Sequence, residues 1–222
     1  MRENQIIKLL RYVLVLGFLF ILILPGYVYF QHRGWFSFLA GADFKTAARL
    51  LFPLFGLYAF TLLWSQLILG PNAILFRKVQ PKITIFHHRQ GIFIFLLAVF
   101  HPTLILIAFG FSQYLGYKFL PQPLALYAFL GTLALGLLTL TVITAILSRL
   151  SFLSYKWRIF HFLNYVVFAL AWIHSWNLGS DIKSTNLKYL WIFFGGTALI
   201  SAFLRFRRTG IKIVFSSLRG QK

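Results

Sequence analysis

Apolar runs long enough to cross a lipid bilayer recur from one end of the chain to the other, and they limit its possible folds more than any other feature. The six runs are Leu9–Phe30, Phe44–Leu69, Ile83–Gly110, Leu124–Leu147, Trp157–Trp176 and Leu187–Leu204. Each supplies about 20 residues or more, enough for a hydrocarbon core about 30 Å thick. The sequence therefore predicts an all-α integral membrane protein, a six-helix transmembrane bundle.

The bundle is expected to form a single domain. The first run is too long for a signal peptide, and no small-residue cleavage motif follows it, so we expect a retained helix. No internal repeat or low-complexity linker divides the chain. We therefore predict one domain over residues 1–222, with a short basic cytoplasmic tail, residues 205–222, that is too small to fold alone.

The charge composition excludes the most obvious soluble alternative. Hydrophobic residues make up 59% of the chain and charged residues only 11%, where a soluble domain carries about 25%. The net charge is +19, which on a soluble protein would suggest nucleic acid. Here the basic residues lie at the ends of the apolar runs, where they set topology and contact anionic lipid. We expect the membrane itself, and no nucleic acid, as the partner of these charges.

The distribution of Lys and Arg predicts the orientation of the bundle. The termini, the second loop and the fourth loop carry Arg2, Lys8, Arg11, Arg77, Lys78, Lys82, Arg89, Arg149, Lys156, Arg158, Arg205, Arg207, Arg208, Lys212, Arg219 and Lys222. The opposite side carries only Arg33, Lys45, Arg49, Lys118, Lys183 and Lys188. Because basic residues favour the cytoplasmic side, we predict an N-in/C-in, multi-pass protein of the inner or plasma membrane.

Missing residue types narrow the chemistry further. The chain has no Cys, and its one Met is Met1. This excludes disulfides, thiolate zinc sites, iron–sulfur clusters and the covalent attachment of c-type haem. The three acids, Glu3, Asp43 and Asp181, lie at or near the ends of the runs, so a carboxylate ion pathway is not expected. The polar chemistry left inside the membrane is that of histidine.

The histidines fall at two depths on two of the predicted helices. His87, His88 and His101 belong to 83–110, while His161 and His174 belong to 157–176. Fourteen residues of helix rise about 21 Å and thirteen rise about 19–20 Å. With the same direction through the membrane, both helices present an inner and an outer imidazole. One imidazole from each helix at each depth predicts bis-histidine ligation of two b-type haems, since Cys and internal Met are absent.

The angles around the helices leave one question open. Fourteen steps bring His87 and His101 to within about 40° of one face, which favours His87 over His88. Thirteen steps leave His161 and His174 about 140° apart on an ideal helix. Either that helix is distorted or tilted, or the two haems approach it from different sides.

The segments "HHRQG…AVFHP" and "WRIFHFLNYVVFALAWIHSW" resemble the ferric-reductase-like transmembrane domain, which includes the membrane parts of NADPH oxidases and metalloreductases. The haem subunit of bacterial methionine sulfoxide reductase systems is a relative. The resemblance implies that His87 and His161 bind an inner haem and that His101 and His174 bind an outer haem. Arg89 and Arg158 would then contact the propionates of the inner haem.

The resemblance also implies a function, namely a transmembrane cytochrome b that is part of an oxidoreductase. The given sequence carries no G-x-G-x-x-G motif for a built-in NADPH site, so electrons would come from a cytoplasmic flavoprotein reductase, a flavin domain missing from this chain, or a quinol. They would pass to ferric iron, oxygen or a periplasmic protein on the outer side. The alternatives are a one-haem subunit of a periplasmic methionine sulfoxide reductase-type system, and a haem-free scaffold or transporter.

Overall fold

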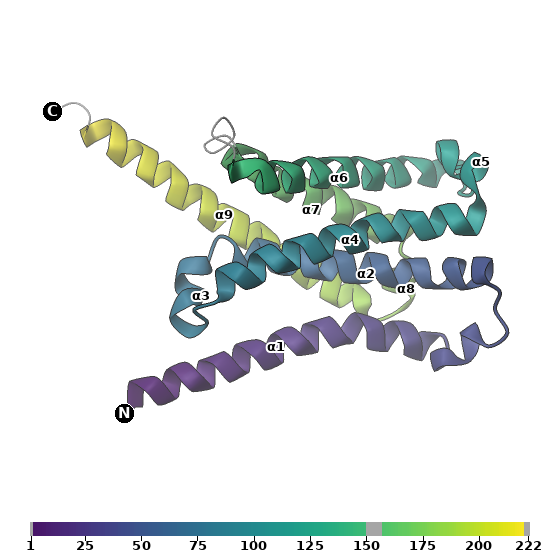
Figure 1. Cartoon of the computed structure of the whole chain (residues 1–222), viewed down its shortest axis with the longest axis horizontal. Coiled ribbons are helices and arrows are strands. Elements are labelled where there is room, and N and C mark those ends of the chain that lie inside the picture. The colour runs from purple at the N-terminus through teal and green to yellow at the C-terminus, as the bar shows by residue number, and fades with distance from the viewer. Residues whose placement is uncertain (1, 150–156, 220–222) are drawn as a thin grey trace.

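The computed structural model describes residues 2–149 and 157–219, and these residues form helices and turns without a strand (Figure 1). The long helices are α1 (Arg2–His32), α2 (Phe44–Leu69), α4 (Ile83–Phe109), α6 (Gln122–Ile146), α7 (Trp157–Leu178) and α9 (Leu187–Arg219). The short elements are α3 (Ala73–Val79), α5 (Phe111–Tyr114), α8 (Ser180–Ser184) and the 3₁₀ turns η1 (Trp35–Leu39), η2 (Leu115–Tyr117) and η3 (Leu147–Arg149).

Five of the described helices are long and apolar enough to cross a membrane, namely α1, α2, α4, α6 and α9. This confirms an all-helical, multi-pass membrane protein. Helix α7 has 22 residues, and it is not among the five helices found within the described residues. The sixth crossing and the N-in/C-in orientation therefore stay predictions.

The long helices form two close antiparallel pairs. Helix α2 packs along α4, and α6 packs along α7 (Figure 1). Helix α1 lies against α2, and α9 contacts both α2 and α7, so it ties the two pairs together. Both described ends of the chain lie at the same end of the bundle, together with α3 (Figure 1).

Local signals in the sequence explain several helix ends. Helix α2 begins where the Asp43 side chain accepts a hydrogen bond from the Thr46 backbone N–H at 2.9 Å. The Thr46 side chain, and after it this backbone bond, hold the pKa of Asp43 below its usual value. Helix α4 ends at Gly110, whose φ of +80° is readily adopted only by glycine. Helix α9 continues beyond Leu204, because Arg205 and Arg207 are good helix formers.

An aromatic core joins the two helix pairs between the levels of the histidines. Phe60 of α2 stacks on Phe168 of α7 and on Trp191 of α9, with ring centroids 5.0 and 5.1 Å apart. The Trp191 indole N–H donates to the Ser175 hydroxyl at 2.8 Å, which satisfies a polar group in the buried core. This rigid core fixes the spacing of the elements that carry the histidines.

Candidate functional site

The two histidines of the predicted outer level face each other from α4 and α7. The ring centroids of His101 and His174 lie 6.3 Å apart, with an angle of 89° between the planes. His101 Nδ1 is 2.7 Å from the Phe52 carbonyl oxygen on α2, and His174 Nδ1 is 2.8 Å from the Tyr127 carbonyl oxygen on α6. A carbonyl oxygen only accepts, so both Nδ1 atoms carry the proton and both Nε2 atoms keep a free lone pair.

The inner histidines form a second pair. The ring centroids of His87 and His161 lie 6.1 Å apart, with an angle of 68° between the planes. His161 Nδ1 is 3.3 Å from the side-chain amide of Asn164. His87 Nδ1 is buried and has no hydrogen-bond partner among the residues that the structure describes. The two levels therefore hold their imidazoles by different means.

The ring spacings match two imidazoles that share one metal ion. An imidazole nitrogen binds a metal at about 2.0–2.1 Å and stands about 1.1 Å from its ring centre, so two facing rings have centres about 6.3 Å apart. Both pairs come within a few tenths of an ångström of this value. With Nε2 free on the outer pair, the residues present fit bis-histidine binding of a haem iron.

Glycines on the neighbouring helices make room for three of the four rings. A Cβ at Gly56 would lie 3.0 Å from the His101 ring, and one at Gly70 would lie 3.2 Å from the His87 ring. A Cβ at Gly131 would lie 2.5 Å from Cε1 of His174. A larger residue at position 131 would push His174 aside, while at positions 56 and 70 the neighbouring atoms would have to give by a few tenths of an ångström, so the glycines form part of the site.

The histidine side chains make the close approach between α4 and α7. Among the described residues, α4 and α7 make few backbone contacts, and their histidine rings bridge the space between them. Both histidines of α7 reach α4 in spite of their thirteen-residue spacing. His174 does so because Gly131 lets its ring lie directly against the α6 backbone.

The remaining predicted site residues lie around the inner pair. Arg89 is exposed on α4, two residues after His87, and His88 is also exposed, with its ring centroid 6.0 Å from that of His87. Arg158 belongs to the first turn of α7, but its side chain lies outside the described residues. Arg205 of α9, which the sequence placed only among the basic residues of the tail, also lies here. Its guanidinium is 5.6 Å from the centre of the Phe162 ring, next to His161.

A polar ladder that the sequence analysis missed links α2 to α4 at the inner level. The Gln66 amide donates to the His87 carbonyl oxygen at 2.9 Å and to the Gln90 side chain at 2.7 Å. The Gln90 amide in turn donates to the Ser65 hydroxyl at 2.7 Å. Buried polar groups inside apolar helices were the available signal, since they are costly unless they are paired. The ladder fixes the helix backbone that carries His87.

A cavity of about 270 Å³ lies against the outer pair. His101 and His174 line it, and it reaches from the middle of the bundle, at Ile94 and Val167, to the short helix α8 at Asp181. The cavity therefore lies directly beside both rings, toward the end of the bundle that carries α8.

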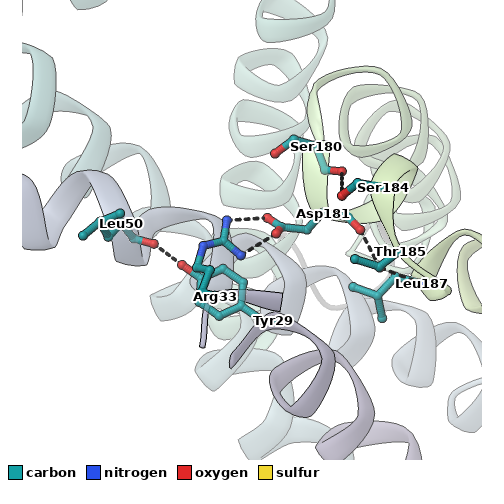
Figure 2. A network of polar contacts seen from close by, with 8 residues as sticks. All are labelled: Tyr29, Arg33, Leu50, Ser180, Asp181, Ser184, Thr185 and Leu187. Atoms are coloured by element: carbon teal, nitrogen blue, oxygen red, sulfur yellow. Dashed lines mark hydrogen bonds and ion pairs between the residues drawn. The ribbon is translucent and has the colours of Figure 1, made fainter. Parts of the chain in front are cut away.

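A salt bridge closes the bundle beside this cavity (Figure 2). Both guanidinium nitrogens of Arg33 bond to the Asp181 carboxylate, and the same guanidinium lies 3.9 Å from the centre of the Tyr29 ring. Burial alone would lower the pKa of Arg33, but the bond to Asp181 outweighs it and raises the pKa. The Tyr29 hydroxyl donates to the Leu50 carbonyl oxygen. The clamp fastens the end of α1 to α2 and α8.

The candidate metal ligands come together in pairs. Among the described residues, no group of three or more His, Asp or Glu side chains comes together to hold a metal ion. This arrangement differs from a protein-only metal centre, which draws three or four ligands from the chain. Two imidazoles at each level would suit a metal whose other ligands belong to a cofactor.

The comparison with protein families gives one match. The model of the family described as "Ferric reductase like transmembrane component" matches residues 55–172, more than half of the chain. The matched segment contains His87, His101 and His161 and ends two residues before His174. Neither the curated proteins nor the solved structures gave a significant match.

Proposed function

Because the chain belongs to the family of ferric reductase-like transmembrane components, we propose that it is a membrane electron-transfer component with two b-type haems. Domains of this family typically bind haem. The observation that carries the proposal is the pair of facing imidazoles at each of two levels, 6.1 and 6.3 Å apart. The helical rise from His87 to His101 puts the levels about 21 Å apart.

Each histidine has a separate task in this proposal. His101 and His174 hold the outer haem through Nε2, while the carbonyl oxygens on α2 and α6 orient their rings. His87 and His161 would hold the inner haem, and Arg89 would pair with its propionates, as would Arg158, whose side chain lies outside the described residues. The haems supply one-electron redox chemistry, and the apolar surround and axial ligands tune their potentials.

The proposed direction follows from the predicted orientation. Electrons enter at the cytoplasmic level from a separate flavoprotein, a flavin domain on a longer chain, or a quinol. They leave at the outer level, where the cavity beside His101 and His174 gives an acceptor its approach. Ferric iron, oxygen and a periplasmic protein are the candidate acceptors.

Electron transfer across lipid vesicles tests the function. The purified protein is reconstituted into vesicles that contain ferricyanide, and dithionite is added outside. We expect internal ferricyanide to be reduced only when the protein is present, and we expect His87→Ala and His101→Ala to abolish the reduction. His88→Ala is the matched control, because its exposed side chain adjoins His87 on the same helix turn.

The outcomes separate the proposed function from its alternatives. If the reduced protein shows no b-type absorption spectrum, both haem proposals are refuted and the haem-free scaffold or transporter is the alternative that is left. One haem per chain that survives His87→Ala would favour a subunit of a methionine sulfoxide reductase-type system. Two haems without transfer to ferricyanide would contradict the transmembrane path.

A further inference from the structure

Another cavity lies between α1, α2 and α4, and it shares no lining residue with the cavity beside His101 and His174. Its volume is about 370 Å³, and the atoms that face it are apolar. Leu22 of α1, four residues of α2 between positions 54 and 62, and Phe93 and Leu97 of α4 line it. Phe93 is 53% exposed, so the cavity opens to the outside of the bundle as a groove. Such a lining suits a hydrocarbon ligand and no polar one.

Helix α1 touches the bundle on either side of this groove. On one side, a Cβ at Gly26 would collide with the Tyr58 hydroxyl, so α1 and α2 are in direct contact there. On the other side, the ring centroids of Phe18 and Phe86 lie 5.7 Å apart and join α1 to α4. Leu22 lies four residues from each contact, at the level of the groove. An empty groove would cost its lining many dispersion contacts, and lipid hydrocarbon surrounds helices that cross a membrane.

One side of α4 leads from the groove to the end of the bundle that carries α3 and the start of α1 (Figure 1). Phe86 and Phe93 are seven residues apart, which places them within about 20° of one helix face, and both are exposed. Lys82, the residue that caps α4, is exposed at the end of this strip. Eleven residues of helix rise about 16–17 Å, close to half of a hydrocarbon core about 30 Å thick. A lipid chain whose head group lies at Lys82 therefore reaches the groove.

Exposed basic side chains gather at that end of the strip. They come from α1, from the start of α4, and from α3, which contacts both, and they are Lys8, Arg11, Arg77, Lys78 and Lys82. Among the described residues, the two arginines form hydrogen bonds only through Nε, at 2.9 and 3.3 Å. Asp43 and Asp181 lie at the opposite end of the bundle, and the side chain of Glu3 lies outside the described residues. Guanidinium groups whose outer nitrogens are available suit a phosphate.

We propose that the groove and this basic cluster bind one anionic phospholipid of the membrane. One acyl chain fills the groove, and the phosphate pairs with Arg11, Arg77 and the neighbouring lysines. The lipid thereby fills the gap that α1 leaves against α2 and α4. The proposal goes beyond electron transfer and holds with or without haem, because the described lining of the groove contains no histidine.

Native mass spectrometry of the full chain, released from detergent after addition of lipid, tests the head-group half of the proposal. We expect one phosphatidylglycerol to stay bound per chain. Phosphatidylcholine with the same chains, and glycerol 3-phosphate without chains, should bind far more weakly. The double variant Arg77→Gln/Lys78→Gln should bind phosphatidylglycerol about 25-fold more weakly, at about fivefold per basic residue. The matched control Lys45→Gln/Lys118→Gln removes two exposed lysines at the opposite end and should bind as the wild type does.

A substitution in the groove tests the acyl-chain half. Leu22→Trp places an indole in the groove and should abolish retention of phosphatidylglycerol, while Leu16→Trp, at a position that is 64% exposed, should leave it unchanged. If Leu22→Trp fails to fold, Leu22→Phe decides by the same criterion, since it adds less volume. Equal binding of phosphatidylcholine and phosphatidylglycerol, equal losses in the two double variants, or full retention in the folded Leu22 variant would each overturn the proposal.

Discussion

Replacing Gly131 with alanine tests how tightly the outer site is built. The added Cβ would lie 2.5 Å from Cε1 of His174, whereas carbon atoms pack at about 3.5–4.0 Å, so the ring must move by about 1 Å or more. Metal–ligand distances tolerate only about 0.2 Å. The movement also strains the 2.8 Å bond from His174 to the Tyr127 carbonyl oxygen. We therefore expect Gly131→Ala to lose the outer haem.

The free-energy cost of Gly131→Ala should be too small to unfold the protein. Overpacking costs about 1–3 kcal/mol, and replacing glycine within a helix returns about 0.5–1 kcal/mol. The net cost of about 0–2.5 kcal/mol is smaller than the stability of most folded domains. The expected result is a folded protein with about half of the wild-type haem.

Two measurements test this prediction. The pyridine haemochrome gives the haem content per chain, and thermal unfolding in detergent gives the stability. Gly136→Ala is the matched control, because it lies on the same helix and its Cβ would meet no atom within 4 Å. It should keep both haems and gain slightly in stability. Gly56→Ala, with its closest approach to His101 at 3.0 Å, should fall between the two. Full haem content and an unchanged spectrum in Gly131→Ala would refute the reasoning.

Three further substitutions probe the clamp, the polar ladder and the histidine doublet. Arg33→Ala should lower the unfolding free energy by about 3 kcal/mol, because it leaves the Asp181 carboxylate, only 4% exposed, without its partner. Asp181→Ala should cost less. Thermal unfolding measures both variants, and a larger loss for Asp181→Ala would contradict the reasoning. Gln90→Leu should lower the unfolding free energy by about 0.6–2 kcal/mol and release the inner haem at a lower temperature. The Soret absorbance during heating measures this release, and an unchanged release temperature would mean that the ladder does not support His87. His88→Ala should retain both haems in the haemochrome assay while His87→Ala loses one, and equal losses would assign both histidines to the site.

The helices were predictable from the sequence because bilayer crossing demands long apolar runs. Helix α2 begins and ends at the predicted residues, Phe44 and Leu69. Helix α9 extends beyond its predicted end, because hydropathy falls at Arg205 while helix propensity does not. The short helices α3 and α8 lacked a periodic signal, and helices of that length depend on tertiary contacts.

The depth of the four histidines was predictable, but the way in which they are held was not. The fourteen-residue spacing of His87 and His101 has a counterpart in Gly56 of the antiparallel helix α2 and Gly70, which directly follows that helix, and this could have been read from the sequence. The support of His174 by α6 could not, because it depends on how α6 and α7 pack. For the same reason, no spacing rule pairs Arg33 with Asp181.

Haem stoichiometry in paired ligand variants tests the central claim most directly. The account predicts two b-type haems per chain in the wild type. It predicts one haem in the double variant His101→Ala/His174→Ala, and one in His87→Ala/His161→Ala. The crossed variant His101→Ala/His161→Ala takes one ligand from each level and should lose both. A crossed variant that keeps one full haem, or a same-level variant that loses both, would contradict two haems each held between α4 and α7.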